Sequence, residues 1–110
     1  MDHKHIYDLL KTLTTTAYSS IPVAYDHFQK GQDVTPPFIA YREISPETFK
    51  ADGLTYYRPY EFEIELVTDK KDVDLEKALE KLLTDNFIPY DILDETWDSN
   101  EQIYHIFYEI

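Results

Sequence analysis

The chain is 110 residues long, the length of one ordinary domain, and we expect residues 1–110 to form a single domain. With 43% hydrophobic residues it can build one modest core, which argues against wholesale disorder. Its formal net charge of -12 repels phosphate backbones and anionic lipids. Specific nucleic-acid binding and membrane binding are therefore disfavoured, and a basic partner or none fits better.

The composition also bears on the compartment. There is no cysteine, so a disulfide framework and thiolate metal sites are excluded and no oxidising compartment is required. The first residues lack an apolar signal core, and no run of about 18 apolar residues occurs, so we expect neither secretion nor a membrane span. The acidity is uneven, because residues 56–110 hold fifteen of the 22 acidic residues.

The beginning of the chain predicts one helix and two strands. Residues 5–17 carry apolar side chains at the i, i+3, i+4 and i+7 spacing of an amphipathic helix. Residues 21–28 and 38–44 favour strands. Pro22 favours an edge position for the first of them, because proline cannot donate to a ladder.

A loop and the clearest strand of the chain follow. Residues 46–55 are expected to form a polar loop around the turn dipeptide Asp52-Gly53. In residues 60–66, bulky apolar and acidic residues alternate with the period of two that a half-buried strand requires. The apolar face holds Tyr60, Phe62, Ile64 and Leu66, and the opposite face holds Glu61, Glu63 and Glu65.

A second helix and two more strands complete the prediction. A leucine-rich stripe over residues 75–83 predicts an amphipathic helix whose outer face, a mixture of acids and lysines, is solvated. Strands are expected near residues 88–93 and 102–110, separated by the polar segment 94–101. This order indicates an α+β fold: a mainly antiparallel sheet of about four to five strands with two amphipathic helices packed on one face.

The sequence offers little for catalysis or for cofactor binding. It has neither a nucleophile elbow around a serine nor a glycine-rich phosphate loop, since it contains only two glycines. We therefore expect no enzyme and no cofactor. The four histidines, His3, His5, His27 and His105, lack a convincing metal-ligand spacing, so we expect no metal site, with His105 partly buried.

Three glutamates form a candidate acidic surface. Glu61, Glu63 and Glu65 repeat with period two, so they share one strand face. One interpretation is a solvated face with Arg42 or Arg58 as cross-strand neighbours. A functional acidic surface is the second interpretation, and an acid-base enzyme using Glu61 or Glu63 is the third, although it would need a pocket and a companion base.

Aromatic residues beside turn signals form a candidate interface. Phe49, Tyr56 and Tyr57 lie near the expected loop, where aromatic residues often mark contacts with other proteins. The alternative is that they fold back onto the core of their own domain. Trp97, in an acidic stretch, has the same two interpretations.

Several stretches together carry a resemblance to a known family. The most specific is the strand-turn-helix segment that ends in Leu66-Val67-Thr68-Asp69-Lys70-Lys71-Asp72. The others are Ile21-Pro22-Val23-Ala24-Tyr25, Pro37-Phe38-Ile39-Ala40-Tyr41, Leu75-Glu76 and Ile103-Tyr104-His105-Ile106-Phe107-Tyr108-Glu109. Over nearly its whole length the chain resembles the small tail-terminator, or tail-to-head joining, proteins of long-tailed phages and prophages of Gram-positive bacteria.

The resemblance implies a structural virion protein. Such subunits form a ring, usually six-fold, at the head-proximal end of the tail, where the ring stops growth of the tube and docks the tail to the head connector. The implied partners are further copies of the chain, the tail tube protein and the head-completion or connector protein. The implied location is the head-tail junction of the virion, and the host cytoplasm during assembly.

The residue-level analysis is compatible with this role. We expect Phe49, Tyr56 and Tyr57 to contribute to subunit or neighbour contacts. If Glu61, Glu63 and Glu65 faced the lumen of a ring, they would repel the passing DNA.

A competing hypothesis also explains the negative charge. A small acidic inhibitor could mimic DNA and occupy the basic groove of a host nucleic-acid protein. It would spread its acids over an exposed face rather than concentrate them among core-forming strands.

Overall fold

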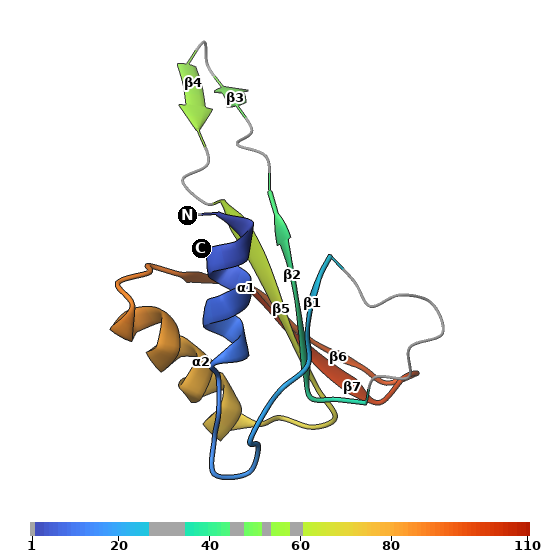
Figure 1. Cartoon of the computed structure of the whole chain (residues 1–110). Helices are drawn as coiled ribbons and strands as arrows, with labels where there is room; N and C mark the ends of the chain where they lie inside the picture. The colour runs from blue at the N-terminus through green and yellow to red at the C-terminus, as the bar shows by residue number, and fades with distance from the viewer. Residues whose placement is uncertain (1, 27–34, 45–47, 52–53, 58–60) are drawn as a thin grey trace.

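A computed structural model describes residues 2–26, 35–44, 48–51, 54–57 and 61–110 of the chain (Figure 1). These residues form two helices and seven strands, which is two strands more than the sequence predicts. They are α1 (His3–Lys11), β1 (Val23–Tyr25), β2 (Phe38–Glu43), β3 (Thr48–Ala51), β4 (Leu54–Tyr57), β5 (Phe62–Thr68), α2 (Val73–Asp85), β6 (Asp91–Asp98) and β7 (Ile103–Glu109).

Five of the strands form one mostly antiparallel sheet. Its order is β1-β2-β5-β7-β6, with β1 parallel to β2 and every other pair antiparallel. Both helices pack on the same face of this sheet (Figure 1). The predicted α+β fold is thus confirmed, and so is the edge position that Pro22 predicted for the strand after it.

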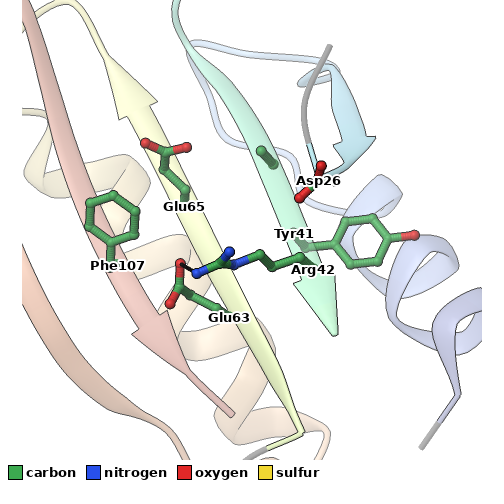
Figure 2. Close-up of a pocket in the computed structure, with 7 residues that line it drawn as sticks. Asp26, Tyr41, Arg42, Glu63, Glu65 and Phe107 are labelled. Carbon is green, nitrogen blue, oxygen red and sulfur yellow. Dashed lines mark ion pairs between the residues drawn. The ribbon is translucent and has the colours of Figure 1, made fainter. Parts of the chain in front are cut away.

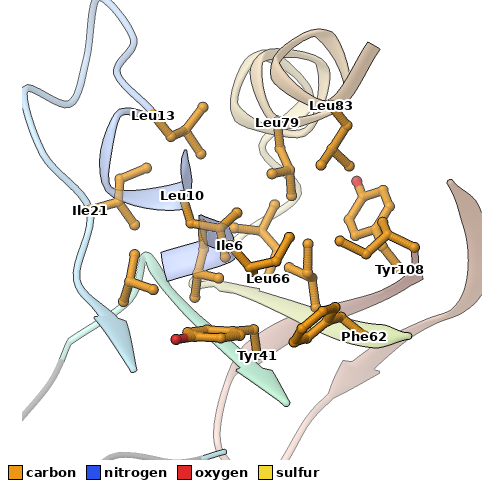
Figure 3. Close-up of a cluster of buried hydrophobic side chains, with 14 of the residues drawn as sticks. Ile6, Leu10, Leu13, Ile21, Tyr41, Phe62, Leu66, Leu79, Leu83 and Tyr108 are labelled. Atoms are coloured by element: carbon orange, nitrogen blue, oxygen red, sulfur yellow. The ribbon is translucent and has the colours of Figure 1, made fainter. Parts of the chain in front are cut away.

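The core lies between the two helices and the sheet (Figure 3). Phe62, Ile64 and Leu66 of β5 point into it and are fully buried, as the alternation in this strand predicts. Tyr60, the fourth residue of the predicted face, lies outside the described residues. Each buried side chain of this size contributes about 1.5–3 kcal/mol to folding before the loss of chain entropy is counted.

The first helix is shorter than predicted. It begins after Asp2, whose carboxylate accepts a hydrogen bond from the His5 N–H at 2.8 Å, and it ends at Lys11 rather than near residue 17. The Thr12 hydroxyl donates to the Leu9 carbonyl at 2.6 Å, and the Thr15 hydroxyl accepts from backbone N–H groups further along the chain. Threonine side chains offer the backbone these alternatives to helical bonds, which explains the early end.

The second helix matches its prediction closely. Asp72 caps it by accepting a hydrogen bond from the Leu75 N–H at 3.1 Å. Leu75, Leu79 and Leu83 repeat every four residues and are all fully buried against the sheet. The predicted leucine stripe is therefore the surface by which α2 packs.

Two expected loops are strands in the structure. The polar loop expected over residues 46–55 contains β3, and β4 begins in it, so the two strands form a separate antiparallel hairpin. The polar segment expected over residues 94–101 belongs largely to β6, which extends to Asp98. The acids there do not prevent a strand, because β7 supplies a full antiparallel partner and the side chains of an edge strand reach water.

Candidate interaction surfaces

The sheet face opposite the helices carries a row of charged residues across four strands. Arg42, Glu63, Glu109 and Asp91 are successive register partners on β2, β5, β7 and β6. An Arg42 guanidinium nitrogen lies 3.4 Å from a Glu63 carboxylate oxygen. The predicted cross-strand arginine is thus present, whereas Arg58, the alternative, lies outside the described residues.

A second pair holds Glu65 on the same face. Nδ1 of His105 on β7 lies 2.6 Å from Oε2 of Glu65, and the two side chains are 23% and 27% exposed. The imidazole also stacks on the Phe107 ring, with 6.2 Å between ring centroids. Glu63 and Glu65 therefore both have basic neighbours, and Glu61 is exposed just before β5. The face is less negative than the three glutamates alone indicate.

A small hollow lies beside these pairs (Figure 2). Its volume is about 230 Å³, smaller than most ligand-binding clefts. Asp26, Ala40, Tyr41, Arg42, Glu63, Glu65 and Phe107 line it.

The Glu65 carboxylate would hold His105 in place as a general base, but catalysis also needs a nucleophile beside the imidazole. Thr96 lies opposite His105 in the β6–β7 register, yet its hydroxyl donates to Asp94 at 3.0 Å. Among the described residues, His105 makes no hydrogen bond to a serine or threonine hydroxyl. The arrangement therefore gives no support to nucleophilic catalysis.

Strand β6 forms the other edge of the sheet and is exposed along almost its whole length. Three of its apolar side chains reach solvent: Ile92 is 51% exposed, Leu93 54% and Trp97 44%. Its four acidic residues, with no basic residue among them, are Asp91, Asp94, Glu95 and Asp98. An edge strand that is both apolar and acidic is a candidate surface for another chain.

A polar cluster joins β6 to the segment before α2. The Lys71 ammonium donates to Glu95 and, at 2.8 Å, to Glu76. The Tyr104 hydroxyl donates to Glu95 at 2.5 Å, and the Lys71 ammonium lies 5.1 Å from the centre of the Tyr104 ring. Hydrogen bonds from Lys71 and then Tyr104 lower the pKa of Glu95, while those from Lys71 to Glu76 and Glu95 raise the pKa of Lys71. Trp97 packs beside Tyr104, with 6.3 Å between ring centroids, although much of its side chain remains exposed.

The end of α2 presents an exposed aromatic residue. The Phe87 N–H donates to the Thr84 carbonyl and the Ile88 N–H donates to the Leu83 carbonyl, which is the Schellman pattern of a helix end. This pattern needs a positive φ at the residue after the cap, and Phe87 has φ 60. Glycine usually occupies this position, but here a phenylalanine does, with 94% of its surface exposed.

The β3–β4 hairpin stands beyond the end of the sheet (Figure 1). It is a separate two-stranded sheet, and in the described part of the chain it pairs with none of the other strands. Two of the predicted interface residues, Phe49 and Tyr56, are direct register partners, and the third, Tyr57, pairs with Thr48. The side chains of all three lie outside the described part of the structure.

The register gives the hairpin one apolar and one polar face. Because residues alternate between faces along a strand, each register pair shares a face with the next pair but one. One face of the ladder holds Phe49, Ala51, Leu54 and Tyr56, and the other holds Thr48, Lys50, Thr55 and Tyr57. Phe49 and Tyr56 therefore share the apolar face, and Tyr57 belongs to the other.

Other kinds of site find little support in the described residues. These contain no group of three or more histidine, aspartate and glutamate side chains that could hold a metal ion. His3, for which the sequence favoured no metal role, packs against Tyr25 and Tyr41. Within the same residues, none of the helices has the length and apolar character needed to cross a membrane.

Neither a protein family nor a curated protein matches the sequence.

Proposed function

We propose that the chain is a structural subunit of a phage tail terminator, which assembles into a ring, as a homo-hexamer, at the head-proximal end of a tail. In this role it stops growth of the tail tube and docks the tail to the head connector. Its partners are further copies of itself, the tail tube protein and the head-completion protein. It acts without a cofactor and is not an enzyme.

The observation that carries the proposal is the amphipathic hairpin outside the sheet. A two-stranded hairpin is only marginally stable in water and needs a third strand or a packing surface. In the described structure neither β3 nor β4 pairs with the five-stranded sheet. A subunit whose hairpin has one apolar register face and, in the described part of the chain, pairs with no other strand is suited to assembly.

The exposed apolar residues elsewhere support the same role. Phe87 lies at the end of α2, and Ile92, Leu93 and Trp97 lie on an edge strand. A head-to-tail ring uses two different surfaces on each subunit, unlike a two-fold dimer, which uses one surface twice. The hairpin and β6 are two such surfaces.

The sheet face opposite the helices is the one that we assign to the lumen. Glu61, Glu63 and Glu65 belong to it, together with Asp91 and Asp94 on β6. The Arg42 guanidinium offsets part of this charge. The remaining negative charge would keep the wall from binding the DNA that passes through.

Deletion of the gene from its parent phage tests the role. Negative-stain electron microscopy of the induced lysate should show filled heads separated from tails, with tails of uncontrolled length, and a complementing copy should restore joined particles. Normal joined particles in the deletion lysate would refute the proposal.

A second candidate function rests on β6. Four acids without a base on one strand, three of them exposed, are also what an acidic inhibitor of a basic nucleic-acid protein would present. Pull-down with the wild-type chain should then capture one basic nucleic-acid enzyme and abolish its DNA binding. A variant with Asp91, Asp94 and Asp98 changed to asparagine should lose that enzyme. Capture that is equal with both proteins would eliminate this candidate.

A further inference from the structure

In the described part of the chain, the hairpin and β6 each lack a neighbouring strand on one side. The apolar face of the hairpin, with Phe49, Ala51, Leu54 and Tyr56, has no third strand beside it and no sheet beneath it among the described residues. Among the described residues strand β6 pairs on one side only, with β7, and its other side forms the edge of the sheet, where a further strand can add.

The hairpin and β6 do not pair with each other within one copy of the chain. The hairpin is inserted between β2 and β5 and stands beyond their ends, whereas β6 is separated from β5 by β7 (Figure 1). The ladder of β6 runs from Asp91 to Asp98 against β7 alone. If the hairpin and β6 pair, they do so between two molecules.

Charge favours the hairpin, rather than a second β6, as the partner of the β6 edge. Two β6 strands placed side by side would bring four acids of one copy against four of the other, and like charges on paired strands are destabilising. The hairpin strands carry no acid and one base, Lys50. The hairpin is therefore electrostatically compatible with β6, and a second β6 is not. The other edge of the sheet, β1, is also free of acids, but it is only three residues long and directly follows Pro22, so it offers a shorter ladder than the hairpin strands.

Both partners of the contact carry apolar residues. Ile92, Leu93 and Trp97 are about half exposed on β6, and the hairpin offers an apolar face of four residues. A register irregularity between Ile92 and Asp94 interrupts the β6 ladder at Leu93. Because a bulge re-aims side chains at a sheet edge, it limits the stretch available for regular pairing to residues 94–98.

We propose that the β3–β4 hairpin of one copy adds to the β6 edge of the next copy, so that the five-stranded sheet of one subunit continues into the hairpin of its neighbour. The inference rests on the ring proposed above and names the contact that closes it. Each copy donates its hairpin once and accepts a hairpin once. Such a head-to-tail contact closes into a ring when the rotation between neighbours permits.

Thiol cross-linking tests this contact, because the chain has no cysteine of its own. We would prepare the full chain as Thr55→Cys, on the polar face of the hairpin, and as Thr96→Cys, on β6. A short bismaleimide is added at millimolar protein concentration. The matched control is Lys77→Cys, at an exposed position on α2.

The proposal predicts a specific pattern of products. A mixture of the Thr55→Cys and Thr96→Cys chains should give covalent dimers, at least tenfold more than a mixture of Thr55→Cys with Lys77→Cys. Each single variant alone should give almost none. A chain with both the Thr55→Cys and the Thr96→Cys substitutions should give a ladder that ends at the ring size.

Three results would overturn the proposal: absence of mixed dimers at this concentration, equal yields with the α2 control, and dimers from either single variant alone. The result is separable from that of the gene deletion. Absence of mixed dimers with separated heads and tails removes only the hairpin contact. If cross-linking gives mixed dimers but the deletion lysate holds normal particles, the chain self-associates through the hairpin and has no role in tails.

Discussion

Phe49 lies directly opposite Tyr56 in the β3–β4 ladder. Aromatic residues paired across two strands stabilise each other, but a single pair does not make a hairpin stable alone in water. In this chain the pair belongs to a hairpin outside the five-stranded sheet. In the proposed ring, a second copy of the chain supplies the surface against which this hairpin packs.

Replacing this aromatic pair should weaken assembly without unfolding the subunit. The double variant Phe49→Ser and Tyr56→Ser should lower the association constant at least tenfold, measured by sedimentation. Because the hairpin forms a sheet separate from the five-stranded one, the free energy of unfolding should change by less than about 0.5 kcal/mol. Thr55→Ser, on the polar face, is the control and should behave as wild type. Unchanged association of the double variant would contradict the assignment.

Replacing Phe87 by glycine should stabilise the fold. The left-handed conformation at φ 60 costs a residue with a side chain about 1–2 kcal/mol, and glycine adopts it freely. The ring is 94% exposed, so its loss costs little burial. After the extra chain entropy of glycine, we expect Phe87→Gly to raise the free energy of unfolding by about 0.5–1 kcal/mol. Phe87→Ala, which keeps a side chain at this φ, should give no such gain in urea unfolding.

Removal of a core leucine should be costly. Leu79 is fully buried between α2 and the sheet, so Leu79→Ala should lower the free energy of unfolding by about 2–5 kcal/mol. Lys77→Ala, at an exposed position on the same helix, should change it by less than about 0.5 kcal/mol. Urea unfolding followed by tryptophan fluorescence measures both. A loss below 1 kcal/mol for Leu79→Ala would show that α2 is not packed as described.

The cluster around Glu95 should add stability that is lost in acid. Lys71 and Tyr104 lower the pKa of Glu95 in the folded chain, so the unfolded chain takes up the proton first as the pH falls. The contribution is therefore complete above the ordinary pKa of glutamate and disappears as the pH falls through the lowered one. For a surface network we expect about 0.5–1 kcal/mol.

The pH dependence of a variant separates this contribution. The difference in the free energy of unfolding between wild type and Glu95→Gln should be largest at neutral pH and vanish in strong acid. Glu101→Gln, at an exposed position outside the cluster, is the control. A difference that is independent of pH would exclude the ion pair as its cause.

Burial of Tyr41 should make the fold sensitive to alkali. Loss of hydration raises its pKa from 10.0 to about 12. Between these values the unfolded chain releases the proton and the folded chain keeps it, so stability should fall by about 1.4 kcal/mol per pH unit. Tyr41→Phe should remove this part of the alkaline loss, and Tyr7→Phe, at an exposed position on α1, should not. Equal alkaline profiles for wild type and Tyr41→Phe would contradict this explanation.

The core was predictable because burial leaves a periodic pattern. Phe62, Ile64 and Leu66 alternate with glutamates, and the leucines of α2 repeat at helical spacing, so their faces follow from the sequence. The end of α1 was less predictable. Leu13 continues the apolar stripe and is buried, yet the helix has already ended at Lys11 because threonine hydroxyls bond to the backbone.

The sequence analysis predicted a loop where the structure has the β3–β4 hairpin, although the sequence contains a turn motif typical of hairpins. Asp52-Gly53 lies between two four-residue strands, and an Asp-Gly pair between strand-like segments is a strong hairpin signal. The polar residues around this dipeptide favoured a loop instead.

Strand β6 and Phe87 carried still weaker signals. Acids in the stretch 94–98 read as a loop, because an edge strand exposed on both sides has no alternation to show. Nothing in the sequence marks Phe87 as a residue with positive φ. The chain instead places a phenylalanine where helix ends favour glycine.

The location of the chain in the virion tests the central claim most directly. An epitope tag before α1, where the side chains from Asp2 to His5 are exposed, should be tolerated, whereas Ile110 at the other terminus is nearly buried. Gold-labelled antibody on purified particles should bind at the head-tail junction, at one position per particle. Label along the tail, or particles without label, would contradict the proposed role.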